Sequence, residues 1–256
     1  MAFNNNEIGT FNDLQTRIGR KTTSAALLKS NPVILKAYDL LEWEGKDIRN
    51  LPYDERRNLL ENLLESIKDK KLPLHLSERK TLNSWDEVTE ERTLAREMRS
   101  EGLMLKRKTS PYQVGRKKGD WWKWKLEPLV IDAVLTYAMR GSGRRSNLFT
   151  DYTFALWQDN ENGEKELVTF AKAYSGLTDD EFRRVDDYIK KNTLEKFGPV
   201  RSVVPKLVFE IGFEGIAFSK RHKSGVATRF PRILRWRHDK NIEEANTIDD
   251  LKDMIP

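Results

Sequence analysis

The apolar residues of this chain follow a helical period in some stretches and a strand period in others. Behind Asp54, leucines recur at helical spacing as far as Ile67, and this pattern predicts an amphipathic helix. Residues 84–87 have the spacing of a capping box and predict a second helix. A third helix is expected over 178–198, with Phe197 on its apolar side.

Strands are expected where β-branched and aromatic residues gather between turn-forming residues. These stretches are residues 33–41, 102–106, 121–125, 129–137, 152–157, 167–174 and 207–218. Helices and strands mix before residue 126, whereas several strands with one inserted helix follow it, which is typical of a small barrel of the OB type. We therefore expect an α+β protein with two domains, residues 1–126 and 127–256.

Composition narrows the class of partner. The chain has 256 residues, 38% of them hydrophobic, and a formal net charge of +6. A positive charge favours a polyanion as partner, although solubility alone can also account for it. The absence of cysteine excludes disulfides and thiolate metal sites. Because the three histidines are scattered along the chain, we assign them no catalytic role.

Positive charge is concentrated in two segments. Residues 101–125 hold eight lysines and arginines against two acidic residues, and residues 201–240 hold ten against three. One basic segment in each expected domain predicts two surfaces that face phosphate across a cleft between the domains. The chain begins without a secretion signal and has no apolar run of the roughly 18 residues that a membrane span needs. We expect a soluble, cytoplasmic protein with no membrane partner.

Two short strands carry candidate chemistry. In residues 121–125, alternation places Lys123 and Lys125 on one face, where ammonium groups suit phosphate oxygens; an edge strand protected by lysines is the alternative. In residues 101–106, Glu101 could bind Mg²⁺ or ribose and Lys106 phosphate. Strict alternation puts these two on opposite faces, so they share a site only if Glu101 precedes the strand. An ordinary buried strand with solvated ends is the alternative.

Four segments resemble the motifs of ATP-dependent DNA ligases, in the order that this family has them. Residues 37–41 (Ala-Tyr-Asp-Leu-Leu) are similar to motif III, residues 101–106 (Glu-Gly-Leu-Met-Leu-Lys) to motif IV, and residues 122–125 (Trp-Lys-Trp-Lys) to motif V. Residues 229–240 (Arg-Phe-Pro-Arg-Ile-Leu-Arg-Trp-Arg-His-Asp-Lys) resemble motif VI. The similarity covers nearly the whole chain and is greatest to the bacterial branch of the family.

The resemblance implies a partial nucleotidyltransferase adenylation domain of the ATP-grasp-like kind, followed by an OB-fold β-barrel. It implies ATP as AMP donor with Mg²⁺ or another divalent metal, and nicked duplex DNA as substrate. In the family, Tyr38 would stack on adenine and Glu101 would bind ribose or the metal. Lys106 would belong to the same nucleotide pocket, and Lys123 and Lys125 would contact the α-phosphate. A core tyrosine is the alternative for Tyr38.

Motif VI would contact the β- and γ-phosphates of ATP. By resemblance, Arg237, Asp239 and Lys240 would orient the β- and γ-phosphates, and the alternative is a solvated basic strand. Further phosphate contacts to DNA are expected from Arg116, Arg144, Arg145, Arg229, Arg232 and Arg235. Without the family, 141–145 would be only a turn with two glycines and two arginines.

One part of the family pattern is missing from the sequence. These ligases adenylate a lysine in a Lys-x-Asp-Gly setting, and the chain contains no Asp-Gly dipeptide. We therefore expect the chain to be the C-terminal half of such a ligase and not to adenylate itself. The intact ligase is expected to be a monomer associated with the nucleoid, with DNA-repair proteins as further partners. A non-catalytic DNA-binding module is the alternative; an RNA ligase or capping enzyme fits residues 229–240 poorly.

Overall fold

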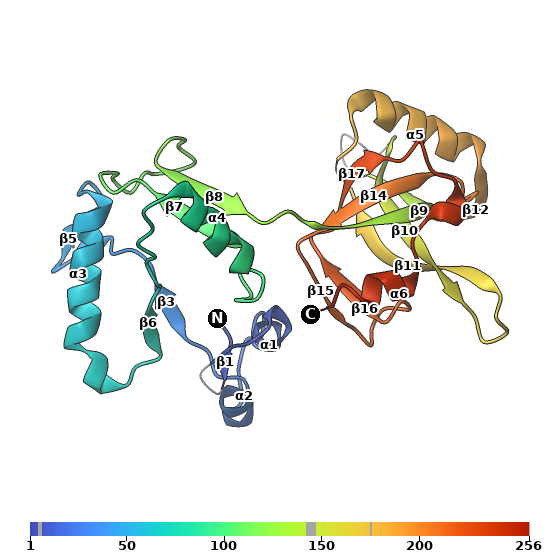
Figure 1. Ribbon diagram of the computed structural model, residues 1–256. Coiled ribbons are helices and arrows are strands. Elements are labelled where there is room, and N and C mark those ends of the chain that lie inside the picture. The colour runs from blue at the N-terminus through green and yellow to red at the C-terminus, as the bar shows by residue number, and fades with distance from the viewer. Residues whose placement is uncertain (5–6, 142–146, 175, 256) are drawn as a thin grey trace. The chain divides into compact units, whose positions relative to one another are not determined.

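The computed structural model describes residues 1–4, 7–141, 147–174 and 176–255. The chain divides into two compact units, Met1–Leu126 and Glu127–Pro256 (Figure 1). Both helices and strands occur in the first unit, and a sheet with one long helix makes up most of the second, so the α+β class is confirmed.

The N-terminal unit combines short helices with two-stranded sheets. Its helices are α1 (Phe11–Gln15), α2 (Ala25–Ser30), α3 (Tyr53–Ser66), the 3-10 turn η1 (Lys68–Lys70) and α4 (Trp85–Leu94). Its strand pairs are β1 (Phe3–Asn4) with β2 (Glu7–Ile8), β3 (Leu35–Ala37) with β6 (Leu74–Leu76), β4 (Glu42–Trp43) with β5 (Lys46–Asp47), and β7 (Gly102–Lys106) with β8 (Trp121–Lys125). The pair β3–β6 is parallel and the others are antiparallel.

The sequence pattern predicted the two long helices of this unit correctly, but it predicted one strand that is longer than the strand in the structure. Helix α3 is confirmed, and α4 starts where Ser84 accepts a hydrogen bond from the Glu87 backbone N–H. The strand expected over 33–41 is wrong beyond β3. After Ala37 the chain leaves the sheet, because the Asp39 carboxylate accepts hydrogen bonds from the Leu40 backbone N–H and from Arg56 instead of letting the strand continue.

The C-terminal unit is built on a curled antiparallel sheet. Its elements are β9 (Leu129–Arg140), β10 (Phe149–Asp159), β11 (Lys165–Ala173), α5 (Asp179–Lys191), β12 (Thr193–Phe197), β13 (Val200–Val203), β14 (Val208–Phe213), β15 (Gly215–Phe218), β16 (Val226–Arg229), β17 (Arg232–Trp236), η3 (Ile242–Glu244) and α6 (Ile248–Lys252). The sheet runs β11-β10-β9-β13-β12, and β14 joins β9 to β17. The long strand β9 thus pairs with both β13 and β14, which lets the sheet curl.

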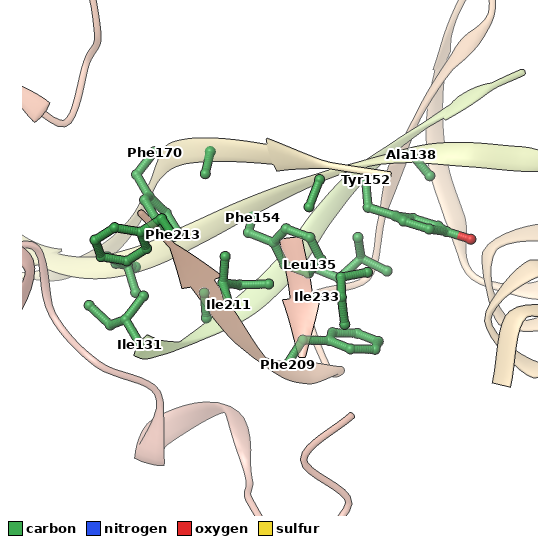
Figure 2. Packing of buried hydrophobic residues seen from close by; sticks show 14 of the residues in the cluster. Ile131, Leu135, Ala138, Tyr152, Phe154, Phe170, Phe209, Ile211, Phe213 and Ile233 are labelled. Atoms are coloured by element: carbon green, nitrogen blue, oxygen red, sulfur yellow. The ribbon is translucent and has the colours of Figure 1, made fainter. Parts of the chain in front are cut away.

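The main core of the second unit lies inside this curl (Figure 2). Alternate residues of β9, β10 and β14 point inward, among them Leu135, Phe154 and Ile211, each fully buried. Helix α5 adds Val185 and Ile189 from its apolar face. Burial of this many large apolar side chains is the main stabilising contribution to the unit.

Two boundaries in this unit differ from the sequence prediction. Helix α5 ends at Lys191 and not near residue 198, because the side chains of Asn192 and Thr193 bond back to helix carbonyls; Phe197 lies in β12 and is 55% exposed. The strand expected over 207–218 is split into β14 and β15, since the Glu214 backbone N–H turns to the Arg229 carbonyl at 2.9 Å. Within the described ranges, no helix has both the length and the apolar character to cross a membrane.

Candidate functional site

The β7–β8 hairpin of the N-terminal unit gathers lysines on one face. Its register pairs Lys106 with Trp121, Met104 with Lys123, and Gly102 with Lys125. Directly opposed residues in an antiparallel pair share a face. Lys106, Lys123 and Lys125 therefore lie on one side, as the alternation predicted for the last two.

The opposite face of β8 packs against helix α4. The ring of Trp124 meets Trp85 edge-on with centroids 6.1 Å apart, and the Arg92 guanidinium lies 5.1 Å from the Trp124 ring centre. Arg92 also donates to the Lys125 carbonyl through Nε at 2.8 Å. These contacts fix the hairpin from behind and leave the lysine face outward.

Glu101 precedes β7 and reaches the lysine face. Its Oε2 atom lies 3.0 Å from the Lys125 Nζ atom, and its carbonyl accepts a hydrogen bond from the Leu126 N–H at 2.9 Å. Gly102 makes this turn possible, with a φ of +135°. An added Cβ there would lie 2.2 Å from the Trp124 carbonyl oxygen, so only glycine fits. Glu101 therefore precedes the strand and lies beside Lys125 at one end of the lysine face.

Lys106 at the other end of the hairpin is surrounded by aromatic rings. Its Nζ atom lies 4.1 Å from the centre of the Trp121 ring and 4.6 Å from those of Tyr38 and Tyr53. It also donates to the Tyr38 carbonyl at 3.2 Å. Burial lowers the pKa of Lys106 to about 8. The ammonium is thus directed at Tyr38 and its neighbours.

The backbone of Tyr38 is held in place by hydrogen bonds at and beside this residue, whereas its ring is exposed to solvent. The side chain is 50% exposed, and its ring meets Trp121 edge-on with a centroid distance of 6.4 Å. The neighbouring Tyr112 raises the pKa of the Tyr38 hydroxyl. On the next residue, the Asp39 carboxylate is held by Arg56 at 2.9 Å. This arrangement leaves an aromatic surface available to a flat ligand.

A divalent metal would find one carboxylate at this face. Among the residues that the structure describes, no group of three or more acidic or histidine side chains could hold a metal ion. Mg²⁺ is commonly bound through one or two carboxylates, with substrate phosphates and water completing its shell. Glu101 fits a metal bound mainly through a phosphate ligand. Arg116 lies exposed in the loop between β7 and β8.

In the C-terminal unit, Arg237 and Lys240 meet at one carboxylate. Strand β17 ends at Trp236, and a turn closed by the Lys240 N–H on the Arg237 carbonyl brings the two side chains together. The Arg237 Nη1 atom and the Lys240 Nζ atom each lie 2.7 Å from Asp132 Oδ2. Asp239 binds the remaining edge of Arg237 at 2.9 and 2.7 Å.

The other expected arginines of 229–240 also have local contacts. Arg235 pairs with Glu210 at 2.8 Å and Arg232 with Glu214 at 2.9 Å. The Arg229 guanidinium lies 4.8 Å from the centre of the Phe230 ring. Two further expected phosphate contacts, Arg144 and Arg145, lie outside the described residues.

Apart from Asp239, sequence reasoning missed the carboxylates that accompany these cations. Asp132 on β9, Glu210 on β14 and Arg235 on β17 are direct partners across three neighbouring strands. Their spacing along the chain gives no hint of this, because it depends on strand order and register. An acidic residue within an otherwise apolar strand, as at Asp132, was the one available signal.

Comparison with protein families identifies both parts of the chain. Residues 1–125 match the family model described as "ATP dependent DNA ligase domain". Residues 145–240 match the model described as "ATP dependent DNA ligase C terminal region". The two matches together span most of the chain and have the order of the units.

Solved structures support the fold. The structure "Pmar-Lig_PreS3" aligns over 90% of this chain and 49% of its own, with a TM-score of 0.66 and 18% identity. A structure from a structure-function analysis of Lig E DNA ligases covers 79% of this chain and 62% of its own, with a TM-score of 0.53 and 20% identity. The expected fold, part of an adenylation domain followed by an OB-fold, is confirmed.

Curated relatives agree with the family models. A probable DNA ligase of Koribacter versatilis is 36% identical over 93% of this chain and 44% of its own length. DNA ligase 1 of Korarchaeum cryptofilum is 34% identical over 95% of this chain and 43% of its own. The chain thus spans less than half the length of these relatives. It belongs to the ATP-dependent DNA ligase family.

Proposed function

We propose that this chain carries nucleotide- and DNA-contacting residues of an ATP-dependent DNA ligase. Such an enzyme seals a 5′-phosphate/3′-hydroxyl nick in duplex DNA through ligase-AMP and DNA-AMP intermediates, in repair, recombination or replication. The observation that carries the proposal is the lysine face of the β7–β8 hairpin, with Tyr38 at one end and Glu101 at the other. AMP has an aromatic base at one end and an anionic phosphate at the other, and this order matches the order of the aromatic and lysine side chains along the face.

Each residue of this face has a chemical task in the proposal. The exposed ring of Tyr38 stacks on adenine, and Lys106 supports that ring from behind through its aromatic contacts. Lys123 and Lys125 neutralise charge on the α-phosphate as AMP is transferred. Glu101 binds ribose, or Mg²⁺ together with the phosphates.

The C-terminal unit contributes phosphate contacts. Arg237 and Lys240 orient the β- and γ-phosphates of ATP, and Asp239 takes part through Arg237, whose Nε and Nη2 edge it holds until a phosphate binds there. DNA phosphates are contacted by Arg116, Arg144, Arg145, Arg229, Arg232 and Arg235. The intact enzyme is a cytoplasmic monomer that works with nicked duplex DNA, ATP and repair proteins.

The test supplies the intermediate that the family makes before sealing. Nicked duplex DNA with an adenylated 5′-phosphate is incubated with the 256-residue chain and Mg²⁺, and labelled ATP is given in a parallel reaction. We expect sealing of the adenylated nick without labelling of the protein, because the chain contains no Lys-x-Asp-Gly motif. DNA binding without sealing would favour a nucleic-acid-binding module, and neither binding nor sealing would contradict the proposal.

A further inference from the structure

Arg237 donates hydrogen bonds to two carboxylates of different character, Asp132 and Asp239, while a third carboxylate, that of Glu210, lies farther away at 3.8 Å. We propose that buried Asp132 is a positioning residue that presents Arg237 and Lys240 to a polyphosphate, whereas exposed Asp239 is the group that the polyphosphate displaces. The inference rests on the phosphate role of Arg237 and Lys240 under the proposed function. It adds a residue outside 229–240 that sets the affinity of this site.

The backbone of Asp132 is fixed on both sides. It lies within β9, and its N–H donates to the Asn246 Oδ1 atom at 2.9 Å while its carbonyl accepts from the Asn246 N–H at 3.0 Å. The segment with Asn246 is anchored in turn by Ile248 and Leu251, both fully buried. Asp132 therefore cannot move without disturbing the C-terminal helix α6.

One oxygen of Asp132 serves two cations. Because the Arg237 Nη1 and Lys240 Nζ atoms both lie 2.7 Å from Oδ2, they are within two hydrogen-bond lengths of each other. Like charges this close repel, and the anion between them offsets the repulsion. The side chain of Asp132 is 9% exposed, and its buried Oδ1 atom accepts no hydrogen bond from any described residue. A buried carboxylate with one unbonded oxygen is a poor source of folding stability. The presence of Asp132 at this position is better explained by its effect on Arg237 and Lys240, which it brings together.

Asp239 occupies the edge of Arg237 that a phosphate would take. It accepts from Nε and Nη2 at 2.9 and 2.7 Å, the parallel pair of bonds that a guanidinium also makes to phosphate. Arg237 holds the pKa of Asp239 well below its usual range, so this group stays anionic. The Asp239 side chain is 66% exposed and can rotate into water. If Asp239 moved away, the Nε and Nη2 atoms of Arg237 would be free to bind phosphate, and Asp132 would still hold the guanidinium in place through Nη1.

The experiment measures binding of inorganic tripolyphosphate to the 256-residue chain by calorimetry. Asp132→Asn should weaken binding about tenfold, since the charged contact that orients both cations is lost. Asp239→Asn should tighten it, because a competing anion is removed. Asp186→Asn is the matched control: that carboxylate is also buried in the same unit, at 5% exposed, but it lies on α5 and its bonds go to Lys190 and to the Phe149 N–H.

A double-mutant comparison separates positioning from general damage to the fold. In a chain that also carries Arg237→Ala and Lys240→Ala, Asp132→Asn should cause no further loss of binding. A further loss would assign Asp132 a structural role and overturn the inference. Unchanged or tighter binding by Asp132→Asn alone would also overturn it, and so would weaker binding by Asp239→Asn. If Arg237→Ala binds as wild type does, or wild type does not bind, the proposed phosphate role fails, and the inference with it.

Discussion

Arg56 grips both carboxylate oxygens of Asp39 at 2.9 Å in the interior of the N-terminal unit. The two side chains are 0% and 2% exposed. Arg56 also donates to the carbonyls of Leu51 and Ser110. This one guanidinium connects the segment after β3, the start of α3 and the loop after β7, and it fixes the backbone next to Tyr38.

Replacement of Arg56 should therefore destabilise the N-terminal unit strongly. Arg56→Ala leaves the Asp39 carboxylate buried without its partner, which costs about 3–5 kcal/mol. Urea unfolding should show the loss. Arg49→Ala is the control, because the Arg49–Asp47 pair has similar geometry but side chains 44% and 55% exposed. Equal unfolding midpoints for the two variants would argue against a structural role for the buried pair.

Tyr38 should contribute to nucleotide binding through its ring alone. Tyr38→Phe keeps the stacking surface and should bind AMP as wild type does, whereas Tyr38→Ala should lose about 1–3 kcal/mol, the usual value for one base stacked on an aromatic ring. Affinity is measured by titration calorimetry. Tyr174→Ala removes a similarly exposed tyrosine from the C-terminal unit and should change nothing. A loss in Tyr38→Phe equal to that in Tyr38→Ala would point to the hydroxyl instead.

The stability contribution of Lys106 should depend on pH in a defined direction. Its pKa of about 8 in the folded chain lies below the value of about 10.4 for an unfolded lysine. Between these values the unfolded chain binds more protons, so rising pH favours the fold by up to about 3 kcal/mol, which solvent screening of the partly exposed side chain reduces to about 2 kcal/mol. Below pH 8 the contribution is constant.

The comparison for Lys106 is Lys106→Met, which fills the same space without a titrating group. The stability of wild type minus that of the variant, from urea unfolding, should rise from about pH 8 to about pH 10. A difference that stays flat or falls over this range would show that the ammonium is not desolvated among the rings.

The local parts of the fold were predictable from the sequence. The bounds of β7 and β8 were correct because their alternation and flanking turns are encoded within a few residues. The Thr178–Glu181 capping box was correct for the same reason. Beyond β3 the local signal was overridden by a distant partner, since Arg56 lies in α3, 17 positions after Asp39.

The candidate site was predictable in its residue types but not in its partners. Motif resemblance named Lys106 and Arg237 and put Tyr38 in the pocket of the first, yet it said nothing of Tyr53 and Trp121 around Lys106 or of Asp132 beside Arg237. Trp121 faces Lys106 through strand register, and Asp132 meets Arg237 over 105 positions of the chain. A sequence pattern indicates that such a cation exists, whereas its surroundings follow only from the fold.

Sealing of adenylated nicked DNA by variants of the lysine face tests the central proposal most directly. The rate of the 256-residue chain is compared with that of Lys123→Ala and of Lys29→Ala, an exposed lysine of α2 in the same unit. Loss of a group that stabilises transition-state charge costs about 10²–10³ in rate. We predict that loss for Lys123→Ala and wild-type sealing for Lys29→Ala. Equal sealing by both variants would contradict the assignment of this face to nucleotidyl transfer.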